Sequence, residues 1–378
     1  MKAKTDIREE TKEKALEQLI ATGRTLIEGA TGVGKTKMSL DLVVERKYDT
    51  VIVLVPTDTV ADSWDKDIEK WYGAGKLPIL VVNYRSAHKL LNVFMCLGTK
   101  CLILDECHHI TDLNLSSLIK LPEDVDMIAL SATVDQEKFE LLEQLQFKKG
   151  IRITTDQAVE HDLIVNYKVS VIEFEPDSVT KNVECGKKGE KFLTTEADNI
   201  RYLEFRFNNA KRAGNSKSIE FAIISRMHFI KSMPSRINIA KKVIAKIKRD
   251  NPSKRLLIFA PTIKIAEELC PECYLHSKSG QEMFEDFVSG KSNHLSSVNM
   301  LSEGVNVQAD MILVLSSYYK ERSTVQQLGR VLRKGADGKE GSMIILCATG
   351  TQDEVWVKNS TANLRNVKRY NAKTLGLA

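Results

Sequence analysis

The chain has 378 residues, 43% hydrophobic and 28% charged, and its 55 Lys and Arg against 50 Asp and Glu leave a net charge of +5. These values indicate a globular protein of two or three domains, at roughly 100–200 residues each, and exclude a disordered tail, a collagen-like fibre and a small disulfide scaffold. The seven cysteines show no framework spacing, which indicates reduced thiols. The N-terminus has no apolar core of a signal peptide, and no apolar run nears the roughly 20 residues of a membrane span. We therefore expect a cytoplasmic protein without membrane contact.

In the first half of the chain, short apolar runs alternate with amphipathic segments. Strands are predicted at 25–28, 50–55, 78–82, 100–104 and 127–130, and helices at 35–46, 60–72, 86–96 and 112–120. Continuous apolar strands between helices are typical of a parallel sheet covered on both faces.

The alternation becomes irregular from 166 to 235, where residues 167–174 are interpreted as an edge or linker strand, and then resumes. Strands are predicted at 255–260, 311–315 and 342–346, and helices at 262–269, 281–289 and 323–333. The sequence thus predicts an α/β fold of two parallel-sheet domains in tandem. Their expected bounds are 1–160 and 236–350, with a linker or insert at 161–235 that could contact nucleic acid and a C-terminal tail at 351–378.

A phosphate-binding motif lies between the first predicted strand and helix. Residues 29–36 read GATGVGKT and match G-x-x-x-x-G-K-[ST]. Glycines let backbone N–H groups turn toward phosphates, and the start of the helix adds its positive dipole end. The residues expected to bind nucleotide are Gly29, Thr31, Gly32, Gly34, Lys35 and Thr36, with Lys35 at the β- and γ-phosphates and Thr36 on Mg²⁺. The alternative, a glycine-rich turn that binds nothing, is disfavoured by the strand–loop–helix context.

Two carboxylates follow the predicted strand at 100–104, in the sequence DECH at 105–108. Open parallel sheets bind ligands at this end of their strands. Asp105 is expected to help hold Mg²⁺, and Glu106 to polarise the water that attacks the γ-phosphate. Two acids after an apolar run more often belong to a solvated turn when no other motif is present. Together with the phosphate-binding motif in the same chain, they predict a nucleoside triphosphatase.

With these motifs the chain resembles the superfamily 2 helicases, whose motifs recur in order along it. They match residues 29–36 (motif I), 55–57 (Ia), 105–108 (II, in a DExH form), 131–133 (III), 257–262 (IV), 299–306 (V) and 326–333 (VI). The resemblance implies two RecA-like domains that close on ATP and Mg²⁺ and drive a motor on nucleic acid.

The resemblance also implies roles for single residues. Arg330 and Arg333 match arginine fingers that stabilise transition-state charge, and Gln326 belongs to the same motif. Gly304 is expected at the nucleotide. Residues expected to couple hydrolysis to movement are His108, Ser131, Thr133 and Glu303, with His108 in contact with motif III or VI. Residues expected at the nucleic-acid backbone are Pro56, Thr57, Tyr84, Arg85 and Thr262.

Two positions depart from the family pattern. Gln327 replaces an arginine of motif VI, and the N-terminal segment around Ile7 and Arg8 has Thr11 where an adenine-reading glutamine is expected. The sequence therefore predicts triphosphate hydrolysis without fixing a strict preference for ATP.

Three further features are open to functional or structural interpretation. Residues 206–255 hold fourteen Lys or Arg and two acids, which favours a phosphate-contact surface over a solvated helix face. Cys270, Cys273 and His276 have half of the spacing of a zinc site, and incidental thiols are the favoured interpretation. The three tryptophans are interpreted as packing residues.

The DExH form, the Glu-Gly of motif V and the compact insert resemble phage and bacterial helicases of the branch-migration and duplex-translocating group. This implies a monomeric DNA motor for repair or recombination, acting on forks, junctions or R-loops, with substrate choice left to the insert, the tail or a protein partner. DNA is favoured over RNA on resemblance alone. An RNA helicase and a nucleotide-gated clamp without processive unwinding are the alternatives, whereas the presence of Lys35, Glu106, Arg330 and Arg333 disfavours an inactive scaffold.

Overall fold

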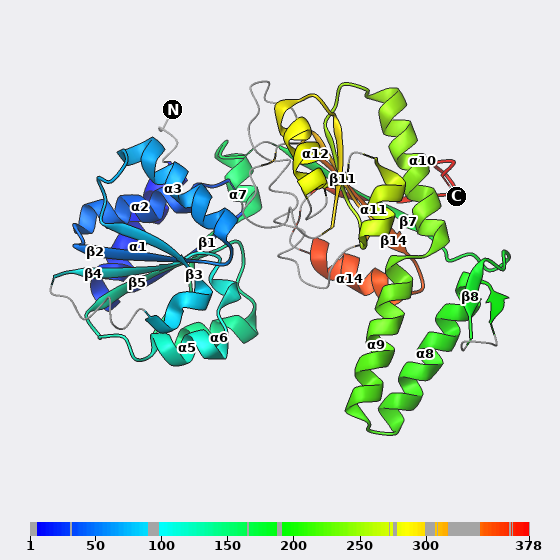
Figure 1. The fold of residues 1–378 in the computed structure, drawn as a ribbon, viewed down its shortest axis with the longest axis horizontal. Helices are drawn as coiled ribbons and strands as arrows, with labels where there is room; N and C mark the ends of the chain where they lie inside the picture. The colour runs from blue at the N-terminus through cyan, green and yellow to red at the C-terminus, as the bar shows by residue number, and fades with distance from the viewer. Residues whose placement is uncertain are drawn as a thin grey trace. The chain divides into compact units, whose positions relative to one another are not determined.

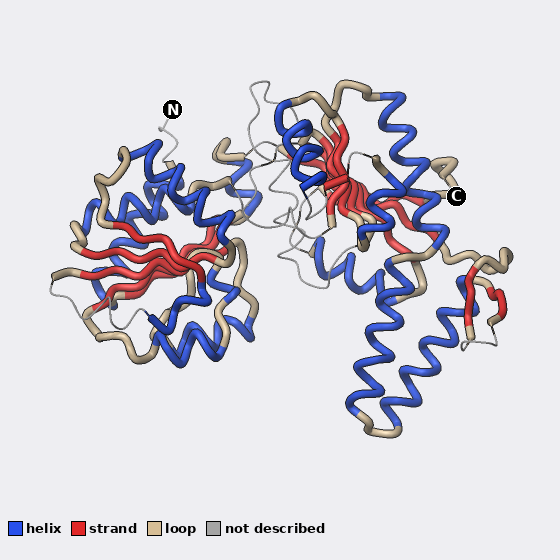
Figure 2. Tube along the Cα trace, in the orientation of Figure 1, coloured by secondary structure: helices blue, strands red, loops and turns tan. Residues whose placement is uncertain are grey.

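The structure is a computed structural model that describes residues 6–30, 32–89, 98–164, 166–186, 191–271, 273–274, 278–298, 307, 309–316, 341–362, 364 and 366–377. The chain divides into two compact units, with the boundary at residues 165 and 166. Each unit is a parallel sheet with helices on its faces (Figures 1 and 2), so the predicted α/β class is confirmed. In the described part of the chain, no helix is both long and apolar enough to cross a membrane.

The first unit is built on a six-stranded sheet of order β3-β2-β4-β5-β1-β6, parallel throughout. Its strands are β1 (Arg24–Gly29), β2 (Thr50–Val55), β3 (Ile79–Asn83), β4 (Lys100–Leu104), β5 (Val125–Ser131) and β6 (Ile151–Ile153). Its helices are α1 (Ile7–Thr22), α2 (Lys35–Arg46), α3 (Asp58–Tyr72), α5 (Asp112–Leu118), α6 (Gln136–Gln144) and α7 (Thr155–Glu160), with short 3₁₀ turns η1 (Tyr84–Lys89) and η2 (Cys107–His109).

Side-chain burial explains why these strands could be found from the sequence. Every residue of β4 is buried, as are all residues of β2 after Thr50, so both strands read as continuous apolar runs. The helix expected at 86–96 is present in its first part only as η1, and residues 90–97 lie outside the described chain. Neither α1 nor β6 was expected from the sequence.

The second unit is built on a seven-stranded sheet of order β11-β12-β10-β13-β14-β7-β15, also parallel throughout. Its strands are β7 (Tyr167–Phe174), β10 (Leu256–Phe259), β11 (Cys273–Tyr274), β12 (His294–Ser297), β13 (Met311–Val314), β14 (Gly341–Ala348) and β15 (Val367–Asn371). Its helices are α10 (Pro234–Asp250), α11 (Ile263–Leu269), α12 (Lys278–Ser289) and α14 (Gln352–Thr361).

Two sequence-based interpretations need correction here. Residues 167–174 are no edge or linker strand, because β7 lies inside the sheet between β14 and β15. Residues 351–378 are no simple tail, because they form α14 and then β15, which pairs with β7. The sequence hides this arrangement because β15 is mostly polar and half-exposed, and its partner is some 200 residues earlier in the chain.

The middle of the chain adds two small motifs to the second unit. β8 (Val183–Cys185) and β9 (Phe192–Thr194) form an antiparallel pair, and α8 (Glu196–Arg212) and α9 (Ser216–Lys231) pack along each other as a helical hairpin. Figure 1 shows the hairpin in green, extending from its sheet as an arm. Thr195 and Asn215 cap the two helices with their side chains.

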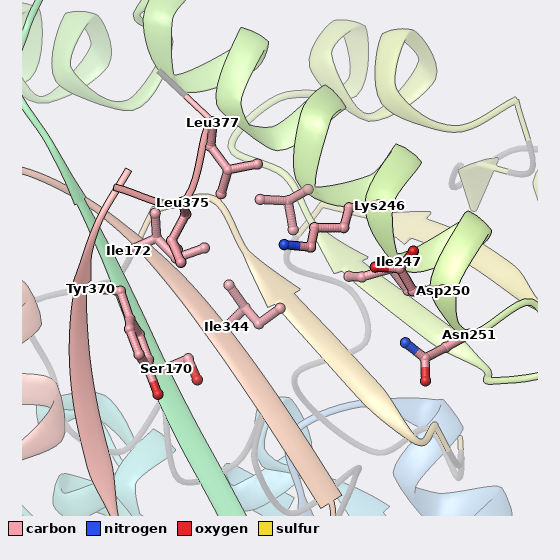
Figure 3. A pocket seen from close by; sticks show the side chains of 11 residues that line it. Ser170, Ile172, Lys246, Ile247, Asp250, Asn251, Ile344, Tyr370, Leu375 and Leu377 are labelled. Carbon is pink, nitrogen blue, oxygen red and sulfur yellow. The ribbon is translucent and has the colours of Figure 1, made fainter. Parts of the chain in front are cut away.

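The C-terminal residues fold back over the second sheet and leave a pocket of about 230 Å³ beneath α10. Figure 3 shows its apolar lining, which includes Ile172, Ile344 and Leu375, with Lys246 and Asp250 at one side. None of motifs I to VI contributes a residue to it, although Lys246 and Asp250 belong to the basic run at 206–255. The pocket shows where the returning C-terminal segment covers the sheet.

Candidate active site

The predicted catalytic residues of the first unit lie at the carboxyl ends of three adjacent strands. The order β4-β5-β1 places the phosphate-binding loop after β1, Ser131 at the end of β5 and Asp105 after β4. The parallel register pairs Glu28 with Ser131. This is where open parallel sheets bind ligands, so motifs from distant parts of the sequence converge as the topology requires.

The phosphate-binding loop has the backbone that its glycines allow. Gly32 and Gly34 have φ values of 93° and 97°, in the left-handed region that side chains disfavour. Lys35 begins α2, and its Nζ donates to the carbonyl of Gly29 at 2.7 Å, so the ammonium group lies over the loop. Thr36 follows in the first turn of the helix. The loop can accept phosphate at the start of α2.

Arg8 supports this loop from α1. Its Nε donates to the carbonyl of Val33 at 2.8 Å, and a Cβ on Gly34 would lie 3.5 Å from the same nitrogen. This role of Arg8 could not be predicted, because no local sequence pattern shows a contact that spans 25 residues.

Asp105 is nearly buried, with 8% of its surface exposed. One carboxylate oxygen accepts the indole N–H of Trp64 at 2.6 Å, and the other accepts the backbone N–H of Glu106 at 2.9 Å. Burial raises the pKa of Asp105, and the Trp64 hydrogen bond and the Lys35 charge act against that rise. Trp64 is therefore more than the packing residue inferred from the sequence.

Glu106 and His108 form the turn after Asp105. Glu106 has φ of 44°, a conformation that costs energy in a residue other than glycine. His108 is buried, and its Nδ1 lies 3.0 Å from the hydroxyl of Ser131 and 3.4 Å from a Glu106 carboxylate oxygen. The Ser131 hydroxyl donates to the carbonyl of Thr133 at 3.0 Å. The expected contact between His108 and motif III is thus present.

The residues expected at nucleic acid occupy different environments. Thr57 and Thr262 cap α3 and α11 with their side chains, Pro56 precedes Thr57, and Arg85 is exposed. Tyr84 differs, because only 6% of it is exposed and its hydroxyl donates to the carbonyl of Asp105 at 3.0 Å. Tyr84 supports the carboxylate turn, and we omit it from the proposed nucleic-acid contacts.

Several predicted site residues lie outside the described chain: Thr31, Glu303, Gly304, Gln326, Arg330 and Arg333. Their roles stay predictions. The possible zinc site also stays a prediction, because only Cys270 of its three residues has a described side chain. Cys270 is buried.

The residues present fit Mg²⁺ bound together with nucleotide. Asp105 supplies a carboxylate and Thr36 a hydroxyl, both hard oxygen donors, while Lys35 supplies charge for phosphate. Within the described ranges, no three His, Cys, Asp or Glu side chains gather into a metal site. That sparse donor set suits Mg²⁺, which commonly takes one or two carboxylates and completes its shell with phosphate and water.

Comparisons with known proteins match each half of the chain. Residues 4–136 match the family "Type III restriction enzyme, res subunit", and residues 236–335 match "Helicase conserved C-terminal domain". A relative from Sulfurisphaera tokodaii, called "DNA 3'-5' translocase XPB2", is 25% identical over 379 residues, covering 93% of this chain and 84% of that protein.

Solved structures share the fold at low sequence identity. The helicase domain of Pyrococcus furiosus Hef is 13% identical with a TM-score of 0.55, covering 94% of this chain and 98% of that one. The restriction-modification enzyme LlaBIII bound to DNA is 15% identical with a TM-score of 0.61, covering 98% of this chain and 31% of that one. S. cerevisiae Dbp5 bound to RNA and ADP BeF3 is 14% identical with a TM-score of 0.58, covering 97% and 90%. The two predicted RecA-like domains are confirmed.

Proposed function

We propose that this chain, an ATP-hydrolysing helicase of superfamily 2, moves along DNA and remodels its strands. The observation that carries the proposal is the convergence of Lys35, the Asp105–Glu106 turn and Ser131 at the ends of three adjacent strands. These are the groups that phosphoryl transfer to water needs, apart from the arginines.

Each residue has a chemical task in this proposal. Lys35 and the loop N–H groups would hold the β- and γ-phosphates, and Asp105 and Thr36 would hold Mg²⁺, which would supply positive charge against the phosphates. Glu106 orients the attacking water and accepts its proton. Arg330 and Arg333 are assigned to stabilising the transition-state charge, as their resemblance to arginine fingers implies.

The contact between His108 and Ser131 supports a coupling role for motif III. It links the turn that carries Glu106 to the end of the neighbouring strand β5 at 3.0 Å. A movement of the Glu106 turn on hydrolysis of the γ-phosphate would therefore be transmitted to β5 through the His108–Ser131 hydrogen bond. In this proposal, residues 131–133 couple hydrolysis to domain movement.

DNA is proposed as the track because the translocase relative is named for DNA. The fold alone does not separate the two nucleic acids, since structures with DNA and with RNA match it at similar TM-scores. The finer placement is part of the same proposal: a DExH branch-migration motor for repair or recombination, monomeric, in a bacterial or phage-infected cytoplasm, with a substrate-selecting protein partner.

The hairpin α8–α9 is the proposed grip on nucleic acid. Tyr202, Phe205, Phe221 and Ile224 are more than half exposed, and the guanidinium of Arg206 lies 5.9 Å from the Tyr202 ring centre and 5.5 Å from that of Phe221. Exposed aromatic rings beside cations are suited to stack on bases and meet phosphates.

The basic run at 206–255 is not one continuous surface. Arg236 within it is fully buried and pairs with Asp353 at 2.6 Å. The cations at the tip of the hairpin are exposed instead: Lys211, Arg212 and Lys217. The proposed phosphate contact is therefore confined to the hairpin and the outer side of α10.

The experiment that tests the function measures ATP hydrolysis without nucleic acid and with single-stranded DNA, duplex DNA, branched DNA and RNA. Stimulation by duplex or branched DNA supports the proposal. Stimulation by RNA alone favours the RNA helicase, and ATP-dependent binding with little turnover favours the clamp. Tyr202→Ala with Phe221→Ala should weaken DNA binding while leaving unstimulated hydrolysis intact, and Ile20→Ala, an exposed apolar residue of α1, is the matched control.

A further inference from the structure

Trp64 is a buried donor to the carboxylate proposed to hold Mg²⁺. It lies in α3, is 2% exposed, and donates its indole N–H to Oδ2 of Asp105 at 2.6 Å. An indole nitrogen can only donate, so this hydrogen bond is available to the carboxylate form at every accessible pH. A hydrogen bond to an ionised oxygen is about twice as strong as one between neutral groups.

Two other contacts of Asp105 hold its backbone rather than its carboxylate. The backbone N–H of Asp105 donates to the carbonyl of Leu54 at 2.9 Å, and the Asp105 carbonyl accepts the Tyr84 hydroxyl at 3.0 Å. The Tyr84 carbonyl in turn accepts the side-chain amide of Asn114 at 2.9 Å. Hydrogen bonds from two neighbouring segments therefore hold the backbone at this strand end.

Two donors set the plane of the carboxylate. The Glu106 N–H binds Oδ1 within the same turn, and Trp64 binds Oδ2 from 41 residues away. Without Trp64, only the Glu106 N–H would hold the carboxylate, and Oδ2 would have lost the partner that fixes its direction. A phenylalanine could fill most of the ring's volume, so packing alone does not call for an N–H directed at this oxygen.

We infer that Trp64 is a positioning residue that orients the Asp105 carboxylate for the Mg²⁺–nucleotide complex. The inference rests on the proposed ATPase function. Trp64 does not touch nucleotide in this role. It limits the carboxylate to the orientation that receives the ion, so the site is preformed before nucleotide binds.

The first test compares Trp64→Phe with Trp71→Phe, a change of the same type seven residues along the same helix. ATP hydrolysis is measured against free Mg²⁺ at saturating ATP. Loss of the bond should raise the Mg²⁺ concentration for half-maximal rate about tenfold in Trp64→Phe and leave it unchanged in Trp71→Phe. A structural role would lower thermal stability without moving this Mg²⁺ dependence, and that result would overturn the inference.

The second test uses the unmodified chain and needs no turnover. The three tryptophans give three indole N–H signals in a ¹H–¹⁵N spectrum, and Trp64→Phe and Trp71→Phe assign two of them. The Trp64 signal should lie far downfield and shift when Mg²⁺ and ADP are added together, more than with ADP alone. A Trp64 signal that does not shift when Mg²⁺ is added with ADP would refute the positioning role of Trp64. Neither test uses nucleic acid, so both can be interpreted even if the protein does not act on DNA. The second test measures Mg²⁺ and nucleotide binding, so it also applies if the protein hydrolyses no ATP.

Discussion

Lys35 is the side chain on which hydrolysis should depend most directly. Its ammonium group lies over the phosphate-binding loop through the 2.7 Å bond to Gly29, so its removal takes charge from the phosphates without disturbing a core. Lys35→Ala should lower ATP hydrolysis by at least about 100-fold, as the loss of one preorganised transition-state donor does elsewhere. Steady-state kinetics measure the loss of hydrolysis, and calorimetric melting checks that the stability of the fold is unchanged.

Lys37→Ala is the control on the same helix. Lys37 pairs with Asp41 and donates to the Tyr72 hydroxyl at 3.0 Å, at the half-exposed surface of α2. Its loss should cost little stability, as is usual for exposed ion pairs, and should leave hydrolysis close to the wild-type rate. Equal loss of activity in the two variants would place the effect in the helix rather than in Lys35.

Ser131 should separate hydrolysis from movement. Ser131→Ala removes the hydroxyl that His108 and Thr133 share and leaves Lys35, Asp105 and Glu106 in place. We expect hydrolysis within about fivefold of wild type, the range of losing a hydrogen bond of about 1 kcal/mol, and strand separation reduced much further. Parallel ATPase and fluorescent unwinding assays decide this, and equal losses in both would remove the coupling role.

The buried cysteines should be unreactive in the native protein. Burial raises the pKa of the Cys347 thiol to about 12, and raises those of Cys101 and Cys107. A raised folded-state pKa means that the neutral thiol stabilises the fold fully below the ordinary value near 9 and that this contribution is lost as pH rises toward 12. At pH 8, alkylation followed by mass spectrometry should label half-buried Cys185 before the buried Cys101, Cys107 and Cys347. Native labelling of Cys347 at the rate of Cys185 would contradict this.

At the scale of elements, one carboxylate fixes the hairpin α8–α9 to its sheet. Glu196, fully buried at the start of α8, accepts the backbone N–H of Asp177 at 2.9 Å and both the N–H and hydroxyl of Ser235 at 2.7 and 2.6 Å. Ser235 lies in the first turn of α10, where the helix dipole favours a negative charge. The joint thus ties the base of the hairpin to the helix that covers the second sheet.

Glu196→Ala should loosen the hairpin without unfolding the sheet. The variant leaves the backbone N–H groups of Asp177 and Ser235 without their acceptor, at a cost of about 1–3 kcal/mol each when buried. Hydrogen exchange should quicken in α8, α9 and the first turn of α10, and remain unchanged in β10 and β13. Glu220→Ala, an exposed acid on α9, should change none of these rates. Faster exchange throughout the second sheet would show that Glu196 holds the whole unit together.

Elements set by local sequence patterns could be predicted from the sequence, whereas elements that depend on partners far along the chain could not. Residues 50–55 and 100–104 form β2 and β4 as expected, because strands buried on both faces are continuous apolar runs. β15 has the sequence VKRYN with its side chains half or fully exposed, so only its pairing with β7 makes it a strand. The hairpin escaped prediction because α8 and α9 bury few apolar side chains.

The same distinction applies within the site. Lys35, Asp105 and Glu106 belong to short motifs and were predictable from their neighbours in the chain. Arg8 and Trp64 act on partners 25 and 41 residues away, and neither has a local pattern that shows it. Tyr84 illustrates the opposite case, since the family resemblance suggested a contact with nucleic acid, whereas its burial and its hydrogen bond favour a role in supporting Asp105.

At the scale of the whole molecule, the two units have separate hydrophobic cores. One core cluster contains Leu26, Ile52, Leu102 and other residues before 150, whereas another contains Ile172, Ile244, Ile258 and further residues after 170. Chains with separate cores commonly unfold in more than one step. We therefore expect two calorimetric transitions that can be shifted independently.

Arg236 and Arg24 provide one variant for each unit. Arg236, wholly buried, pairs with Asp353 at 2.6 Å and donates to the carbonyls of Ile230 and Leu346 at 3.1 Å each, joining α9, α10, β14 and α14. Arg24 donates to the carbonyls of Gly23 and Val125 at 2.8 Å and to that of Leu145 at 3.0 Å.

Arg236→Met leaves the Asp353 carboxylate buried without its counter-ion, which costs about 3–5 kcal/mol and should lower one transition by roughly 10 °C or more. Arg24→Met removes donors to three carbonyls and should lower the other transition instead, because its contacts all lie in the first unit. Differential scanning calorimetry of both variants and of the double variant measures this. If each variant lowers the midpoint of a different transition, and the double variant shows both decreases in full, the two units unfold independently. Effects at distant, independent sites are additive. A single transition lowered by either change would show instead that the two sheets unfold as one cooperative body.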